Sequence, residues 1–232
     1  MADVRRIVGG VITTGVAAAI LVLAIPNAVV SFRLLGADWA WDGLISGARV
    51  PVFGLTELRG ALRDTQKWLP SGENLYRQGF TERGLARTEL PGTPDRVAWN
   101  QAAEGAFEAG LSRAPSNPHG WVMLAHMRNV NGVPEGGVAD ALRMSLLTGP
   151  YQRVLAPLRI STALDVWGTL GPADRVQFAE QIRWTNTFNQ IRLMEITLRD
   201  DRFRPIVVGA LSADPKAMGI FVEGLRRLYL SK

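Results

Sequence analysis

The stretch APSNPHGWVMLAHMR, residues 114–128, decides the fold that the sequence predicts. Proline cannot continue a helix interior but fits a first turn, so Pro115 and Pro118 indicate a corner between two helices. Asn117 precedes Pro118 directly, and its side chain is placed to cap the helix that Pro118 starts. Trp121 follows inside that helix, where we expect it to be a core aromatic.

The same pattern recurs farther along the chain. The segment AFEAGLSRAP (106–115) aligns with ALRMSLLTGP (141–150) at an offset of 35 residues. This offset is one more than the 34-residue period of tetratricopeptide repeats, in which each unit is a pair of helices. Because one pair cannot cover its own apolar face, neighbouring pairs must stack. The sequence therefore predicts a tetratricopeptide-like helical-hairpin repeat, although a third unit, 151–188, keeps little of the pattern.

Helical patterning continues from residue 73 to the end, and strand-like alternation is nearly absent. Thr93 followed by Pro94 is a helix start signal. The run IVV at 206–208 is too short to count as a strand. We therefore expect an all-α soluble portion, whose later helices cover 121–129, 138–147, 151–168, 172–188, 190–199 and 216–230.

The amino-terminal stretch IVGGVITTGVAAAILVLAI, residues 7–25, is uncharged and apolar or small throughout. At about 1.5 Å per residue it would be roughly 29 Å long, close to the hydrocarbon thickness of a bilayer. A cleaved signal peptide would have a shorter apolar region and small residues before the cleavage point, and a core helix would be amphipathic. We expect a single transmembrane helix that ends at Pro26 and Asn27.

The charges that flank this helix predict its orientation. Arg5 and Arg6 precede the apolar stretch, and the positive-inside rule places them in the cytoplasm, whereas Arg33 opposes this weakly. The bulk of the chain is then periplasmic, and the chain is a single-pass protein of the bacterial inner membrane. The expected domains are an anchor at 1–32, a juxtamembrane segment at 33–72 and a helical repeat-like domain at 73–232.

The predicted juxtamembrane segment, 33–72, has two halves. The first is rich in glycine and irregular, and Pro51 should interrupt any helix there. The second, LTELRGALRDTQKWLP (55–70), spaces its leucines as a helix does, with Thr56 as a possible N-cap and Pro70 as a stop. We expect a helix that lies on the surface or beside the membrane.

Small residues line part of the predicted anchor. Gly10, Thr14 and Ala18 share one face. Gly15 with Ala19 forms a further pair of small residues four apart. Small residues let helix backbones approach closely in lipid, which makes this a candidate packing face. Glycine and alanine are also common in such helices for other reasons, so the face remains an alternative to a plain tether.

Composition excludes several kinds of chemistry. The chain contains no cysteine, which excludes disulfides, thiolate catalysis and zinc–thiolate sites. Its net charge is +5, but no Lys/Arg run exceeds a pair, so we expect no nucleic-acid binding. No nucleotide-binding, metalloprotease, nucleophile-elbow or calcium-loop motif occurs. We expect no cofactor, no metal and no enzymatic activity.

The remaining polar candidates have simpler explanations. His119 and His126 lie about two helical turns apart, but the next carboxylate is Glu135, so a capping or surface role is favoured over a metal site. Glu104 and Glu108 are four apart on one helix. Such a pair can work as acid and base, but more often it forms a solvated face or an ion pair.

Aromatic side chains supply the candidate partner-binding residues. Core packing is the favoured role for the tryptophans, and a concave aromatic face that stacks on sugar rings is the alternative. Trp121, Tyr151 and Trp167 are our candidates, because exposed aromatics at repeat corners often anchor a partner. The tryptophans of the helical region are Trp68, Trp99, Trp121, Trp167 and Trp184.

Between Leu111 and Gln181 the chain resembles the VpsP-type polysaccharide biosynthesis proteins of bacteria. The resemblance is carried by SRAPSNPHGWVMLAHMR (112–128), ALRMSLLTGPYQRVLAPLRISTAL (141–164) and AEQIRWT (179–185). It implies one amino-terminal membrane segment and an accessory role in making or exporting a cell-surface polysaccharide (exopolysaccharide). It offers no catalytic motif to transfer, and neither the segment 129–137 nor the carboxy-terminal helices align.

The sequence thus predicts a membrane-anchored periplasmic scaffold that is accessory to cell-surface polysaccharide biosynthesis or export. Its expected partners are other membrane or periplasmic proteins, and the lipid bilayer through residues 7–25. A first alternative is an accessory subunit of another bacterial membrane complex, held by the face of Gly10 and Thr14. A second is an enzyme or glycan-binding module with Glu104 and Glu108 at its site.

Overall fold

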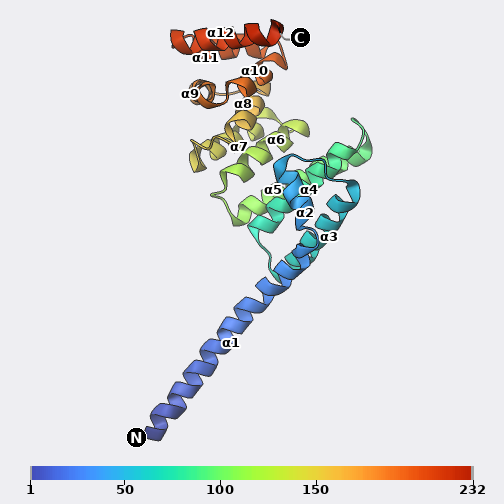
Figure 1. Ribbon diagram of the computed structural model, residues 1–232, viewed down its shortest axis with the longest axis vertical. Coiled ribbons are helices and arrows are strands. Elements are labelled where there is room, and N and C mark those ends of the chain that lie inside the picture. The colour runs from blue at the N-terminus through green and yellow to red at the C-terminus, as the bar shows by residue number, and fades with distance from the viewer. Residues whose placement is uncertain (1, 231–232) are drawn as a thin grey trace. The chain divides into compact units, whose positions relative to one another are not determined.

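The computed structural model describes residues 2–230, with side chains for 15–22, 24–134 and 136–227. Over residues 2–230 every regular element is a helix and no strand occurs, which confirms the all-α prediction (Figure 1). The helices are α1 (Ala2–Leu35), α2 (Asp38–Ser46), α3 (Val52–Trp68), α4 (Gly72–Thr88), α5 (Pro94–Arg113), α6 (Pro118–Val130), α7 (Glu135–Thr148), α8 (Ala156–Asp165), α9 (Pro172–Phe188), α10 (Gln190–Leu198), α11 (Phe203–Leu211) and α12 (Pro215–Leu230).

The chain divides into two compact units, Met1–Ala114 and Pro115–Lys232. The boundary between the two units falls at the proline corner of Pro115 and Pro118. Helix α3 belongs to the first unit, where it packs against α1 and α4.

The first unit closes around the end of α1. Val30 and Leu34 of α1 are buried together with Leu58 and Leu62 of α3. The predicted helix is amphipathic: Leu58 and Leu62 pack against α1, whereas Trp68 is exposed, so its apolar stripe is covered within the unit. The last turns of α1 are part of this core and not only a tether.

Helix α3 runs antiparallel to the end of α1 (Figure 1). Arg33 approaches Asp64 at 3.5 Å, whereas Gly36, three residues later, lies beside Glu57, seven residues earlier in α3. The carboxy-terminal turn of α3, with the half-exposed Trp68, therefore lies toward the amino-terminal part of α1. This direction matters if α1 crosses a membrane, because Trp68 then faces the membrane side of the unit.

Three local expectations for this region are wrong. Helix α1 does not end at Pro26 but continues to Leu35, since the packing of its last turns offsets the hydrogen bond that proline removes. The stretch expected to be irregular contains α2, which ends at Gly47 in a left-handed conformation with φ of 77°. Thr56 caps nothing: α3 begins after Pro51, and the Thr56 hydroxyl donates to the Val52 carbonyl.

Helices α4 and α5 form a close antiparallel hairpin. Gly79 of α4 leaves room for the ring of Phe107, and a Cβ atom at Gly79 would lie 2.8 Å from that ring. The rings of Tyr76 and Phe107 meet edge to face with centroids 5.7 Å apart. The predicted start of α5 is confirmed: Thr93 accepts a hydrogen bond from the backbone N–H of Arg96, and Pro94 occupies the first turn.

The second unit begins with the proline corner at Pro115 and Pro118. The side-chain oxygen of Asn117 accepts hydrogen bonds from the backbone N–H groups of His119 and Gly120, both at 3.1 Å. The predicted cap and the predicted helix start at Pro118 are thus confirmed. Helices α6 and α7 then pack against each other, and α8 follows against both.

The end of the second unit has its own core, formed between α8, α9, α10, α11 and α12. Helix α11 is not among the predicted helices, because the run IVV at 206–208 hid its pattern. Its Phe203, Val207 and Leu211 are spaced by four residues and are buried, which is a helical stripe. Helix α12 lies beside α11 and buries Phe221 in the same core (Figure 1).

A candidate interaction surface along helix α9

The corner after α7 is held by a buried arginine. Arg159 of α8 is fully buried, and its guanidinium donates hydrogen bonds to three backbone carbonyls. These are the carbonyls of Ser145 at 2.5 Å, Gly149 at 2.8 Å and Pro150 at 3.2 Å. A fourth hydrogen bond reaches the Ser145 hydroxyl at 2.9 Å, and that hydroxyl in turn donates to the Pro118 carbonyl at 2.7 Å.

This arrangement explains what the stretch SLLTGPY, 145–151, does in the fold. The last carbonyls of a helix have no partner within the helix and carry partial negative charge, so a cation there is favourable. Burial lowers the pKa of Arg159 to about 10, which still leaves the guanidinium protonated at neutral pH. Arg159 therefore closes the end of α7 and determines where the next residue, Tyr151, is presented.

Tyr151 is the exposed member of a surface cluster of aromatic rings, whose other members, Trp184 and Phe188, are half-buried. Its side chain is 72% exposed, and its ring meets that of Trp184 edge to face at 5.6 Å. Trp184 meets Phe188 at 4.7 Å, and the guanidinium of Arg153 lies over the Phe188 ring at 5.2 Å. Trp184 and Phe188 are one turn apart on α9, so the cluster combines that helix with the corner after α7.

A pocket of about 340 Å³ lies on one side of this cluster, between the end of α7 and the middle of α9. Gln181 donates from its amide nitrogen to the Pro150 carbonyl at 3.2 Å, while its amide oxygen is buried without a hydrogen-bond partner. The pocket is lined by Leu146, Leu147, Pro150, Tyr151, Gln177, Glu180 and Gln181.

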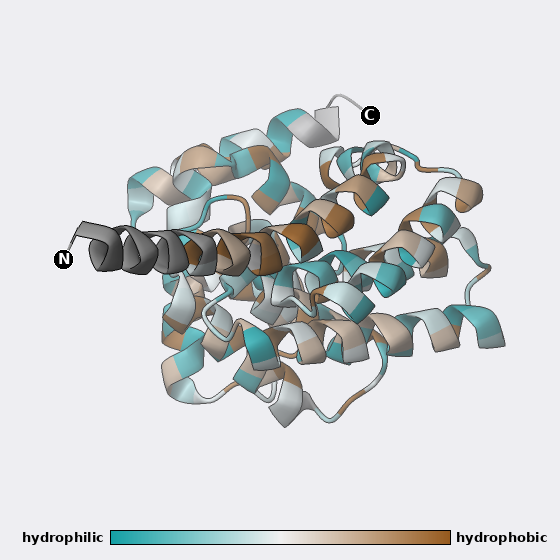
Figure 2. Cartoon of the chain, turned by 90° about the horizontal axis from the view of Figure 1, so that it is seen from below, coloured by the Kyte–Doolittle hydropathy of each residue, from teal (hydrophilic) through white to brown (hydrophobic). Residues whose placement is uncertain are grey.

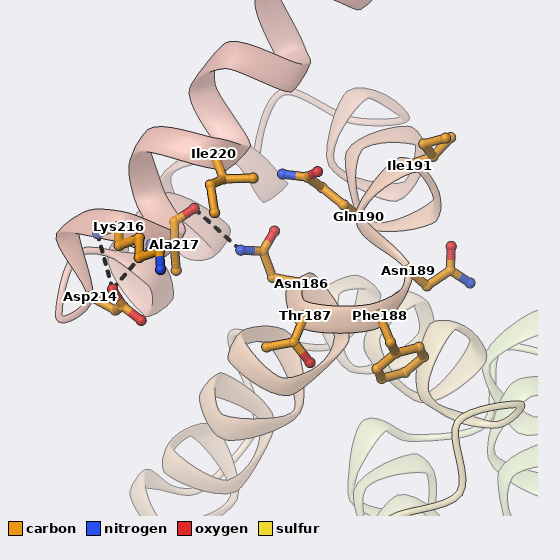
Figure 3. Close-up of a pocket in the computed structure, with 10 residues that line it drawn as sticks. All are labelled: Asn186, Thr187, Phe188, Asn189, Gln190, Ile191, Asp214, Lys216, Ala217 and Ile220. Atoms are coloured by element: carbon orange, nitrogen blue, oxygen red, sulfur yellow. Dashed lines mark hydrogen bonds between the residues drawn. The ribbon is translucent and has the colours of Figure 1, made fainter.

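A second, larger pocket of about 620 Å³ lies where the end of α9 meets the starts of α10 and α12 (Figure 3). Asn186 donates from its amide nitrogen to the Ala217 carbonyl at 3.2 Å. Asp214 caps α12 by accepting from the backbone N–H groups of Lys216 and Ala217. Phe188 lines this pocket too, so it joins the pocket to the aromatic cluster.

One face of α9 connects the two pockets. Gln177, Gln181, Trp184 and Phe188 are spaced by four, three and four residues, which places them along one side of the helix. We call these four residues, together with Tyr151 and the two pockets, the α9 face. It combines a surface aromatic cluster with polar groups in concave surroundings, which is the character of a binding surface.

The structure separates the three predicted partner-binding residues. Tyr151 lies on the α9 face. Trp121 is half-buried at the start of α6, not in the core as expected, because its indole N–H donates to the Pro115 carbonyl at 2.7 Å. Trp167 is half-buried against the carboxy-terminal core.

The other tryptophans of the helical region are not simply core residues, contrary to the favoured expectation. Trp68 is 51% exposed, and Trp99 and Trp184 are half-buried. The guanidinium of Arg59 stacks over Trp99 at 4.5 Å. Sequence reasoning did not single out Trp184 with Phe188, although their spacing of four within one helix was the available signal.

None of the predicted polar candidates is among the residues that form the α9 face. Burial, with a smaller contribution from the charge of Arg159, lowers the pKa of His119 to about 4, so its imidazole is neutral at physiological pH. Glu104 is half-buried and Glu108 exposed on α5 of the first unit. Among the residues that the structure describes, no three His, Cys, Asp or Glu side chains gather as a metal site would require.

Within the described part of the chain, α1 alone is long and apolar enough to cross a membrane, over Gly15–Leu35. Before its last turns enter the core, the described apolar side chains of α1 are mostly exposed, with Ile20 60% and Val22 70% exposed, and its coloured part is mostly brown in Figure 2. Ala18 is exposed, and a Cβ atom at Gly15 would meet nothing within 4 Å. The side chains of Gly10 and Thr14, also predicted to pack, lie outside the described ones.

Comparison of the chain with protein-family models, with curated proteins and with solved structures finds no match. The resemblance to the VpsP-type proteins therefore stays an expectation drawn from its motif residues. The structure adds a physical role for one of those motifs, since SLLTGPY contains the carbonyls that Arg159 holds and the tyrosine that the corner presents.

Proposed function

We propose that this chain is a membrane-anchored interaction protein whose second unit presents the α9 face to a partner protein, as a scaffold or adaptor does. The observation that carries the proposal is Tyr151, a large aromatic that is 72% exposed although a buried arginine holds the corner on which it stands. Exposed aromatics in rigid settings lose little conformational freedom on binding, which makes them effective anchors.

The proposed location is the bacterial inner membrane, with α1 as the single span and the bulk of the chain in the periplasm. The outward apolar face of α1 supports a span, because such a surface is costly to leave in water. Arg5 and Arg6 before it support the orientation. The α1 helix continues without a break into the first unit, so the anchor also orients that unit.

We further propose that the chain serves cell-surface polysaccharide biosynthesis or export. Support for this comes from the motif residues in 112–128, 141–164 and 179–185 alone. The aromatic geometry favours a protein partner over a sugar chain: Tyr151, Trp184 and Phe188 meet edge to face at 77° and 61°, so they form no flat stacking platform.

The proposed scaffold is a degenerate repeat of tetratricopeptide-like hairpins. The close pairs α4 with α5 and α6 with α7 support it, since each is a helix–turn–helix unit. Helix α6 begins 46 residues after α4, and α8 begins 38 residues after α6, so the period is longer and less regular than in regular arrays.

Site-specific photocrosslinking tests the interaction role. A photoreactive amino acid would replace Tyr151 in the full chain, expressed in its native membranes, and products would be identified by mass spectrometry. A matched control places the same group at Val176, which is 60% exposed and also on α9 but outside the α9 face. We expect a defined partner at position 151 and not at 176. Self-products alone, or identical products at both positions, would refute the role.

The absence of cysteine allows a clean test of orientation. Ser212 is exposed at the end of α11, so Ser212→Cys introduces one accessible thiol. We expect a membrane-impermeant maleimide to label this thiol in cells whose outer membrane is permeabilised and whose inner membrane is intact. Labelling only after the inner membrane is lysed would reverse the proposed topology.

A second candidate function is an accessory subunit of another bacterial membrane complex, held through α1. The open surface at Gly15 and Ala18 favours it, because a neighbouring helix could approach there closely. Replacing Gly10 and Gly15 by leucine should then release the chain from its complex in native gels. Association that persists in this variant would refute this second candidate function and leave α1 as a tether.

A further inference from the structure

The larger pocket of the α9 face contains two polar atoms without hydrogen-bond partners. Asn186 is only 8% exposed, and its amide oxygen has no partner although its amide nitrogen is bonded to the Ala217 carbonyl. The amide nitrogen of Gln190 is also buried and without a partner. Figure 3 shows both amide groups directed into the same space beside Ile220.

These two atoms form a pair with a definite polarity. The bond to Ala217 fixes which end of the Asn186 amide points into the pocket, so the pocket offers an acceptor there. Gln190 offers a donor. Buried polar groups in folded proteins nearly always have partners, and each unpaired group is unfavourable for the fold, so a pair that converges on one pocket points to a ligand.

The ligand that matches one acceptor and one donor is the backbone of an extended peptide. A residue in extended conformation presents its N–H and its C=O on the same side, as in a hydrogen-bonded pair of an antiparallel sheet. The N–H would donate to the Asn186 oxygen, and the C=O would accept from the Gln190 nitrogen. The pocket volume of about 620 Å³ lies within the range of ligand-binding pockets.

The apolar walls suggest the side chains of such a peptide. Ile220 is 50% exposed at the pocket, and Phe188 connects it to Trp184 and Tyr151. An aliphatic residue on Ile220 and a further apolar residue on the aromatic cluster would bury these surfaces. The charges at the pocket are one of each sign, Lys216 and Asp214, so they favour neither an acidic nor a basic ligand strongly.

We propose that this pocket binds an extended, apolar peptide segment of the partner protein, with Asn186 and Gln190 pairing to the backbone of one of its residues. The inference rests on the proposed interaction role and names the chemistry of the partner. Gln190 gives the cleaner test, because its amide nitrogen has no bond within the chain to lose, whereas changing Asn186 would also break the bond to Ala217.

The test uses the full chain in lipid nanodiscs, screened against an array of random dodecapeptides. The strongest peptides are then titrated by fluorescence anisotropy. We expect Gln190→Met to weaken binding about tenfold or more, and methylation of a single backbone nitrogen of the peptide to do the same. Gln101→Met, an exposed glutamine on α5 of the first unit, is the matched control and should bind as the unaltered chain does.

Thermal unfolding of the same variants separates binding from folding. Gln190→Met should melt at the same temperature or higher, since it replaces an unpaired buried amide by a side chain of similar size. A lower melting temperature, with peptide binding lost in proportion, would make Gln190 a structural residue and overturn the inference. Equal peptide affinity in Gln190→Met and the unaltered chain would overturn it too.

Further outcomes distinguish a failure of the peptide proposal from a failure of the proposed interaction role. If no peptide binds while Tyr151 still crosslinks to a defined partner, the peptide assignment fails and the scaffold role stands. If oligomers of N-acetylglucosamine bind in the same assay and Gln190→Met abolishes that binding, the ligand is a glycan and the peptide assignment is wrong. If no peptide binds and the photoreactive group at position 151 also gives no defined crosslink, both proposals fail.

Discussion

The guanidinium of Arg159 in α8 donates a hydrogen bond to the hydroxyl of Ser145 in α7 at 2.9 Å, and the Ser145 hydroxyl donates to the carbonyl of Pro118 at the start of α6. These two side chains thus connect three helices, and no ion pair of Arg159 with a carboxylate is found among the described residues. The positive charge is balanced by carbonyl dipoles at the end of α7, which explains why a fully buried arginine is tolerated there.

Replacing this arginine should destabilise the second unit. Arg159→Met removes the hydrogen bonds to the carbonyls of Ser145 and Gly149, while the Pro150 carbonyl keeps its bond from Gln181, and we expect a loss of about 3 kcal/mol in the free energy of unfolding. Chemical denaturation in detergent, followed by tryptophan fluorescence, measures it. Arg153→Met, at an exposed arginine nearby, should change stability by less than about 0.5 kcal/mol. Equal losses in the two variants would contradict the role of Arg159.

The folded state should become less stable as the pH is lowered from 6.5 to 4, because the pKa of His119 is lower in the folded chain than in the unfolded chain. The unfolded chain binds a proton at His119 below pH 6.5, whereas burial and Arg159 hold the folded pKa near 4. The unfolded state therefore binds more protons between these values, and the folded state loses up to about 3 kcal/mol on acidification from pH 7 to 4.

The variant His119→Gln isolates this contribution. It removes the titrating group, so its unfolding free energy should depend less on pH between 6.5 and 4 than that of the unaltered chain. Denaturation midpoints at half-unit pH intervals provide the comparison. Parallel pH profiles for the two chains would show that His119 is not responsible.

Replacing two different glycines of the α4–α5 hairpin by alanine should change the stability of the protein in opposite directions. At Gly79 a Cβ atom would lie 2.8 Å from the Phe107 ring, so Gly79→Ala forces the helices apart and costs about 1–3 kcal/mol. At Gly105 a Cβ atom meets nothing within 4 Å, so Gly105→Ala should stabilise α5 by about 0.5–1 kcal/mol. Thermal melts of both variants check the sign, and destabilisation by both would contradict the assigned contacts.

Truncation should show that the end of α1 belongs to the fold. A chain that starts at Pro26 keeps Val30 and Leu34, and its first unit should stay folded. A chain that starts at Gly36 loses both, which removes about 4 kcal/mol of apolar burial against Leu58. Hydrogen exchange of α3 reports the difference, and equal protection in the two truncated chains would refute the role of α1.

Much of the local structure follows from the sequence because its causes are local. Asn117 with Pro118, and Thr93 with Pro94, predict helix starts that the structure confirms, since a cap and a first-turn proline act within a few residues. The all-α class and an apolar amino-terminal helix follow for the same reason. Helix bounds that depend on packing, such as the end of α1, could not be predicted in this way.

The sequence by itself determined the starts of α5 and α6, each at a cap followed by proline, and an amino-terminal helix apolar enough to span a membrane. Only the tertiary structure decided that Leu58 is buried by α1, that Arg159 closes α7, and that Trp184 joins Tyr151 on an exposed face. A cap or a first-turn proline acts on backbone groups within one helical turn, and the apolar character of a span can be read from one continuous stretch. Burial depends on which distant segment covers a residue, and no local pattern contains that information.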